Sequence, residues 1–365
     1  MEESSQEDVI SLVNSIFQVS NFTKTEFSLE FRIEDLEFKS KFEELARTLE
    51  IMNYVCKLEN VENNKYIIIQ KLPVRKQRKW LKSIWIPRVL FGVVITFVMI
   101  DGYYRTEEFN TIAYIGDPLE MAVIYTLSLL GILGVHELGH LIASRYHKLS
   151  TTWPYFIPGI PIYGLIPTFG AIIQSKGLTI NREILFDVAI AGPIAGLVIA
   201  IIVSLYGAYT LPIIESTDIQ QFSEDGGNII GLPFGNPLLF QGALSAFGKE
   251  SQFVLYTPVL WASWIGFLIT FLNLLPASQL DGGHMARTLL GAKWHKYATY
   301  ASLGILVLLG FWMFALLILA LSSRNLSANP LDDISPLTRN RKIAYVGVIC
   351  LAVLCAPLPV NLLAQ

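Results

Sequence analysis

The strongest constraint on this chain is a series of long apolar segments, each near the length of about 20 residues that a helix needs to cross a bilayer. Only 16% of the 365 residues are charged, whereas soluble domains carry about 25%. The sequence therefore predicts a polytopic α-helical membrane protein with about six transmembrane helices. The six segments are 84–103, 120–144, 184–207, 256–276, 297–321 and 343–363.

The first 80 residues differ in character and predict a small α+β domain. We expect a helix over about 6–17, a strand over 27–33 and an amphipathic helix over 34–52. Two more strand patterns flank "ENNK" and predict a hairpin. The chain is therefore divided into a soluble domain at 1–80 and a six-helix membrane domain at 81–365.

The distribution of Lys and Arg residues predicts the orientation of the chain in the membrane. The basic segment "KLPVRKQRKWLK" at 71–82 indicates contact with anionic lipid and places the N-terminal domain in the cytoplasm by the positive-inside rule. The loop at 322–342 disagrees, because alternation puts it outside although it holds several Arg and Lys residues. A net charge of −3 argues against a nucleic-acid partner. The acidic N-terminus is no signal peptide, so we expect a prokaryotic plasma membrane, although a processed organellar protein would look similar.

The second apolar segment ends in a polar cluster, "GVHELGH". His136 and His140 are four residues apart and share one helix face, with Glu137 between them. Each ionisable group at bilayer depth costs on the order of a few kcal/mol, so the three require a compensating partner. Two imidazoles at this spacing can bind one zinc ion, with Glu137 as the general base for a water. The alternative is a polar helix end that faces water.

A catalytic zinc site usually has three protein ligands, so a third should lie elsewhere. The three cysteines form no CxxC pair, which leaves His, Asp or Glu. The fourth segment ends "FLNLLPASQLDGGHMAR", and its Asp281 lies on the same predicted side as His136. Pro276 and the following glycine pair interrupt the helix, and such backbone is tolerated at depth only within protein or a water-filled cavity. Asp281 is the candidate ligand, His284 is its rival, and an ordinary polar turn is the alternative.

Four stretches together resemble one known family. "HELGH", "NLLPASQLDGG" and the glycine-rich "LFDVAIAGPIAGLVIA" are similar to the site-2 protease family of intramembrane zinc metalloproteases, peptidase family M50. "PYFIP" followed by "PTFGAIIQSK" resembles its chloroplast branch and related prokaryotic members, which also carry a soluble N-terminal region. The motifs cover about 120–290, the expected catalytic core. The family often has proline where Leu280 stands here.

The resemblance implies specific roles at this centre. One zinc ion would be bound by His136, His140 and Asp281, and Glu137 would activate the water. Asn273 would hold the substrate strand or the developing oxyanion. Gly192 and Gly196, in "AGPIAG", are interpreted as helix-packing positions.

A substrate helix must unwind before cleavage, because a helix in lipid hides its carbonyl groups. The proline- and glycine-rich stretch 153–177 predicts a re-entrant loop or β-hairpin, and "TFGA" could offer an edge to which an unwound substrate adds as a strand. The alternative is a plain interfacial connector. The candidate substrate-binding residues there are Thr168, Phe169, Gly170 and Ala171.

The sequence thus favours an intramembrane zinc endopeptidase that cleaves within or near transmembrane segments of membrane proteins, as in regulated intramembrane proteolysis. Its expected partners are transmembrane substrates and lipids, with a homo-oligomer left open. The alternatives are a metal-ion transporter or a non-proteolytic scaffold with the same His/Asp site. Glu137 and the scarcity of charge in four of the segments argue against transport. The N-terminal domain could gate substrates, dimerise or act as a cap.

Overall fold

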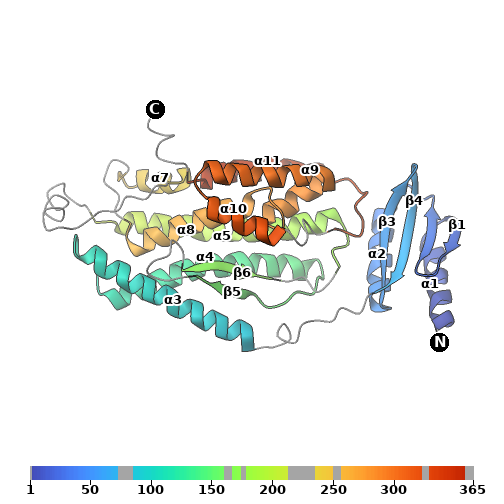
Figure 1. The fold of residues 1–365 in the computed structure, drawn as a ribbon, viewed down its shortest axis with the longest axis horizontal. Helices are drawn as coiled ribbons and strands as arrows, with labels where there is room; N and C mark the ends of the chain where they lie inside the picture. The colour runs from blue at the N-terminus through green and yellow to red at the C-terminus, as the bar shows by residue number, and fades with distance from the viewer. Residues whose placement is uncertain are drawn as a thin grey trace.

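The computed structural model joins a small sheet-containing domain to a bundle of long helices (Figure 1). Most of the basic segment 71–82, the tip of the proline-rich stretch and the end of the sixth apolar segment lie outside the described residues, so the predictions made for them stay predictions. The described residues are 2–72, 85–159, 167–173, 178–212, 235–249, 256–322 and 329–357.

Residues 2–72 fold into a four-stranded antiparallel sheet, of order β1-β2-β4-β3, with two helices. The predicted helices, the strand and the hairpin are present, although the second helix begins at Lys39 and not at residue 34. The hairpin turns at Glu62 and Asn63, which both have positive φ. β1 was not predicted, because its polar residues are exposed at the sheet edge and show no alternation. The elements are α1 (Glu2–Ile16), β1 (Val19–Lys24), β2 (Leu29–Ile33), α2 (Lys39–Ile51), β3 (Tyr54–Val61) and β4 (Asn64–Lys71).

The rest of the chain is mostly helical, as expected. α3, α4 and α5 are long and apolar enough to cross a membrane, and α8 is apolar but shorter. Three spans are therefore supported in the described residues, and the full count of six is not. The elements are α3 (Trp85–Asn110), α4 (Pro118–Tyr146), β5 (Tyr155–Pro158), β6 (Thr168–Ile172), α5 (Arg182–Thr210), α7 (Leu238–Ser245), α8 (Pro258–Leu274), α9 (Asp281–Leu308), α10 (Trp312–Ser322) and α11 (Arg339–Cys355).

Side-chain caps fix where the two central helices begin. The Asp117 carboxylate accepts hydrogen bonds from the backbone N–H groups of Leu119 and Glu120, so α4 starts at Pro118. Asn181 caps α5 in the same way through the N–H of Ile184. The two helices pack against each other along their length and lie side by side in Figure 1.

The stretch predicted as a re-entrant loop or β-hairpin contains two antiparallel strands, β5 and β6. Phe156 of β5 packs against Phe91 of α3, with ring centroids 4.8 Å apart. Gly170 has a φ of 86°, which a side chain would strain. The β-hairpin alternative is therefore the one that the described residues support.

The fifth predicted segment, 297–321, is not one helix. α9 ends at Leu308, Gly310 turns the chain with a φ of 86°, and α10 begins at Trp312 and packs on α9. α9 itself is kinked at Gly291. An almost uninterrupted apolar sequence concealed the break, because composition does not reveal a turn between two apolar helices.

The chain after α10 returns to the N-terminal domain, residues 2–72. We call residues 329–335 the strap. Its Leu331 donates to the Thr179 carbonyl at 2.9 Å and accepts from the Leu58 N–H of β3 at 2.9 Å, while Asp332 donates to the Ile180 carbonyl at 2.7 Å. The described part of the basic loop, from residue 329 onward, thus lies on the same side as the N-terminal domain. The conflict with the positive-inside rule came from counting 297–321 as a single crossing.

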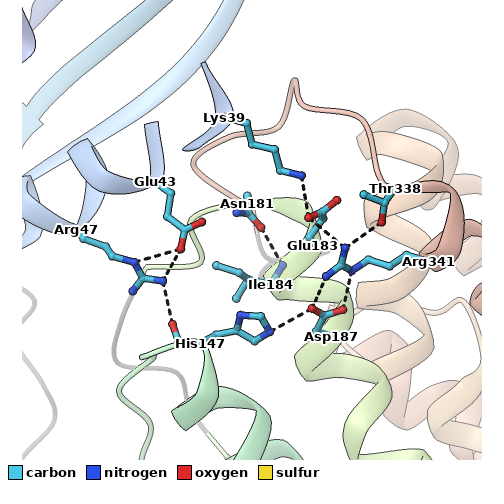
Figure 2. A network of polar contacts seen from close by, with 10 residues as sticks. All are labelled: Lys39, Glu43, Arg47, His147, Asn181, Glu183, Ile184, Asp187, Thr338 and Arg341. Carbon is cyan, nitrogen blue, oxygen red and sulfur yellow. Dashed lines mark hydrogen bonds and ion pairs between the residues drawn. The ribbon is translucent and has the colours of Figure 1, made fainter. Parts of the chain in front are cut away.

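Polar contacts also join the N-terminal domain to the bundle (Figure 2). Lys39 of α2 lies 2.8 Å from Glu183, which also meets Arg341 at 3.1 Å. Arg341 in turn donates to both carboxylate oxygens of Asp187. Arg47 of α2 donates to the backbone carbonyl of the residue that caps the end of α4. The hydrophobic core of the N-terminal domain also includes side chains from around the start of α5 and from the strap, namely Ile180, Ile184 and Leu331.

Candidate metal centre

The first two candidate ligands lie on α4. The Nε2 atoms of His136 and His140 are 3.1 Å apart, and both rings are largely buried. The Nδ1 atom of His140 lies 2.8 Å from the Val188 carbonyl of α5 and donates to it. In a neutral ring this leaves a lone pair on Nε2, which is the atom that faces His136.

The third candidate comes from the first residue of α9. The Asp281 Oδ2 atom lies 3.3 Å from the Nε2 atoms of both histidines. The two following glycines allow this approach, because a Cβ at Gly282 would lie 2.1 Å from the Leu274 carbonyl oxygen. The predicted interruption of the helix therefore serves to bring the start of α9 against the end of α8.

These three atoms fit a divalent metal. They form a triangle with edges of 3.1, 3.3 and 3.3 Å. Zinc bonds of about 2.0–2.1 Å in tetrahedral geometry require ligand atoms about 3.3–3.4 Å apart. When neither Nε2 atom carries a proton, two nitrogen lone pairs and a carboxylate at such distances repel one another, and a divalent cation among them would remove that repulsion. His136, His140 and Asp281 are the group with metal-binding potential in the described part of the chain, and the rival His284 does not join it.

Two further predicted residues lie near this group. Glu137 is buried, with 8% of its surface exposed, and follows His136 directly on α4. The Asn273 amide nitrogen, on α8, lies 3.5 Å from the His136 Nε2 atom. A carboxylate and an amide donor therefore flank the three candidate ligands.

The predicted substrate-binding residues lie on β6, and the structure describes only some of their side chains. Thr168 donates a hydrogen bond from its hydroxyl to the Ile157 carbonyl at 2.9 Å, and Ala171 packs against the hydrophobic core of the bundle. The side chain of Phe169 lies outside the described residues. β6 thus pairs with β5 and packs near α4, and its contact with a substrate stays a prediction.

Two glycines of α5 were predicted only as helix-packing positions, but in the structure they leave room for the side chains of His136 and His140. A Cβ at Gly192 would lie 2.1 Å from the His140 Nε2 atom, and one at Gly196 would lie 2.9 Å from the His136 Cβ. The i, i+4 spacing of the glycines matches the i, i+4 spacing of the histidines across the interface. That shared spacing is a signal in the sequence that could have revealed the pairing.

A family model described as Peptidase family M50 matches residues 124–317. This is more than half of the chain and includes every candidate metal ligand, so the chain belongs to peptidase family M50. The predicted resemblance is confirmed.

Curated relatives agree with this assignment. The chain is 32% identical over 234 residues to the Arabidopsis thaliana "Probable zinc metalloprotease EGY2, chloroplastic", a match that covers 61% of this chain and 39% of the relative. It is also 30% identical over 261 residues to "Probable zinc metalloprotease EGY1, chloroplastic" of Arabidopsis thaliana, a match that covers 67% of this chain and 46% of the relative. The chain thus spans less than half the length of these relatives. No solved structure matches significantly. Because the relatives are named chloroplastic, they lend no support to the predicted prokaryotic plasma membrane.

Proposed function

We propose that this chain is an intramembrane zinc endopeptidase that hydrolyses peptide bonds within or near transmembrane segments of other membrane proteins. The observation that carries the proposal is the convergence of His136, His140 and Asp281 from two distant helices, beside Glu137. The family match and the relatives' names support it. We assign one zinc ion to this site.

The membrane setting follows from the helices that hold the site. α4 and α5 are both long and apolar enough to span a bilayer, and the two candidate histidines lie within the span of α4. The proposed site would then lie below the membrane surface on the side of the soluble domain. We place that side in the cytoplasm on the strength of the basic segment at 71–82.

Each residue near the centre has a proposed task. A bound zinc ion would supply Lewis-acid chemistry, which polarises a carbonyl group and makes water easier to deprotonate. Glu137 would accept the proton of the attacking water and deliver it to the leaving amine. The Asn273 amide would donate a hydrogen bond to the charge that develops on the scissile carbonyl oxygen. The Val188 carbonyl would hold the ring of His140 in orientation.

The substrate has to expose a peptide bond that its own helix protects. An unwound segment in a membrane needs new partners for its N–H and C=O groups. We propose that it finds them along β6, at Thr168, Phe169, Gly170 and Ala171, by strand addition. The sheet topology supports this, since β6 pairs with β5 alone in the described residues and a strand at a sheet edge keeps hydrogen-bonding groups free.

The proposal is tested with the purified full chain, reconstituted in liposomes with a labelled transmembrane substrate. Glu137→Gln should keep zinc near one equivalent, because the metal ligands are intact, but should lose cleavage. Glu120→Gln is the matched control, since it makes the same change at an exposed position in the first turn of the same helix. Cleavage by Glu137→Gln at the rate of the control would show that the assigned base is wrong.

A further inference from the structure

An ion pair between a buried arginine and a partly exposed aspartate lies close to the start of α9. Arg287 follows Asp281 by six residues and is only 2% exposed. Its guanidinium donates to both carboxylate oxygens of Asp333, at 3.1 and 2.6 Å. Such bidentate pairing fixes the orientation of the two side chains as well as their separation, because the two N–H groups of the planar guanidinium match the two carboxylate oxygens.

The partner carboxylate is itself held in place. Asp333 belongs to the strap and also accepts a hydrogen bond from the Arg182 Nε atom of α5 at 2.8 Å. Next to it, the Asp332 carboxylate accepts from the N–H groups of Ile334 and Ser335, which closes the turn. With the backbone pairing described above, the strap is fixed to α5 on one side and to β3 on the other.

The first part of α9 needs such a support. The kink at Gly291 separates residues 281–290 from the rest of the helix, so the later part does not fix their orientation. Side chains reach about 5–6 Å from a helix axis, so a rotation of 10° moves a carboxylate by about 1 Å. Zinc ligands must lie within about 0.2 Å of their bond length. A small rotation of this segment would therefore remove Asp281 from the site.

We propose that Arg287 and Asp333 are positioning residues that fix the rotation of residues 281–290 and so hold the Asp281 carboxylate toward His136 and His140. At six residues from Asp281, Arg287 lies on another side of the helix and resists rotation there. Because β3 is hydrogen-bonded to the same strap, the soluble domain is linked to the metal centre by this route. The inference rests on the proposed zinc site.

The test is zinc affinity of the purified full chain, measured by competition with a chromophoric chelator, together with the absorption spectrum of the cobalt-substituted protein. Asp333→Asn should bind zinc about tenfold more weakly, as for the loss of other groups that orient a ligand. Its cobalt spectrum should change at a temperature at which the protein is fully folded. Glu183→Gln is the control, because it also removes a carboxylate from this interface. The ion-pair partners of Glu183 are Lys39 and Arg341, and neither lies on α9.

A second variant keeps the inference open to refutation if Asp333→Asn does not fold. Arg287→Lys retains the charge but loses the fork, so its zinc affinity should fall between those of the wild type and Asp333→Asn. Wild-type zinc affinity and cobalt spectrum in a folded variant of either residue would overturn the positioning role. Failure of the wild-type protein to bind zinc would instead refute the proposed function.

Discussion

Replacement of Gly192 by alanine tests the geometry of the centre most sharply. The added Cβ would lie 2.1 Å from the His140 Nε2 atom, whereas ordinary contact begins at about 3.4 Å. The ring must therefore retreat by about 1.3 Å, the difference between these distances. Since a zinc–nitrogen bond is about 2.0–2.1 Å long, the retreat removes His140 as a ligand.

We expect Gly192→Ala to weaken zinc binding by about 10- to 100-fold, or about 1.4–2.8 kcal/mol. Cleavage should fall by about 100-fold even at saturating zinc, because an error of about 1 Å at a reacting centre has that effect. Zinc affinity is read by chelator competition and cleavage by the liposome assay.

Gly134→Ala provides the matched control, because it adds the same methyl group to α4 in open space. It should leave both measurements unchanged. Equal zinc affinity in Gly192→Ala and Gly134→Ala would refute the assignment of His140 as a ligand in this rotamer.

Three other predictions follow from the described residues. Cys56 is fully buried and burial raises the pKa of its thiol to about 12, so maleimide at pH 7.5 should label it only after unfolding, as mass spectrometry would show. Burial opposes ionisation of Asp333, but hydrogen bonds from Arg287 and Arg182 outweigh it and lower the pKa of this carboxyl below 3.8. Its stabilising contribution is thus complete above about pH 4 and is lost as the pH falls through the lowered value, so Asp333→Asn should lose less thermal stability than the wild type between pH 5 and pH 2. Chelation of zinc should abolish cleavage and lower the melting temperature, and added zinc should restore both; an unchanged melting temperature after verified zinc removal would contradict the prediction.

The sequence was sufficient for the local parts of the site. His136 and His140 share a face because helical periodicity is fixed, and Asp281 stood out because a charged residue beside two glycines interrupts an apolar segment. The fold of the N-terminal domain was also predictable, since β3 and β4 meet through a short turn and α2 has an apolar stripe. In each case the information lies within a few residues of the feature.

The parts that were missed depend on how distant segments meet. Gly192 was assigned only to helix packing. Its i, i+4 spacing with Gly196 matches that of the two histidines, but the contact with His140 itself depends on how α5 meets α4. The pairing of Arg287 with Asp333 joins segments 46 residues apart, and nothing near either residue specifies the other. The turn at Gly310 lies in continuous apolar sequence, where hydropathy gives no boundary.

The most direct measurement of the central claim is the position of zinc in anomalous diffraction data from crystals of the purified protein, collected at the zinc edge. We expect one peak, about 2.0–2.2 Å from the Nε2 atoms of His136 and His140 and from a carboxylate oxygen of Asp281. A protein that contains zinc but shows its peak away from these three atoms would contradict the account.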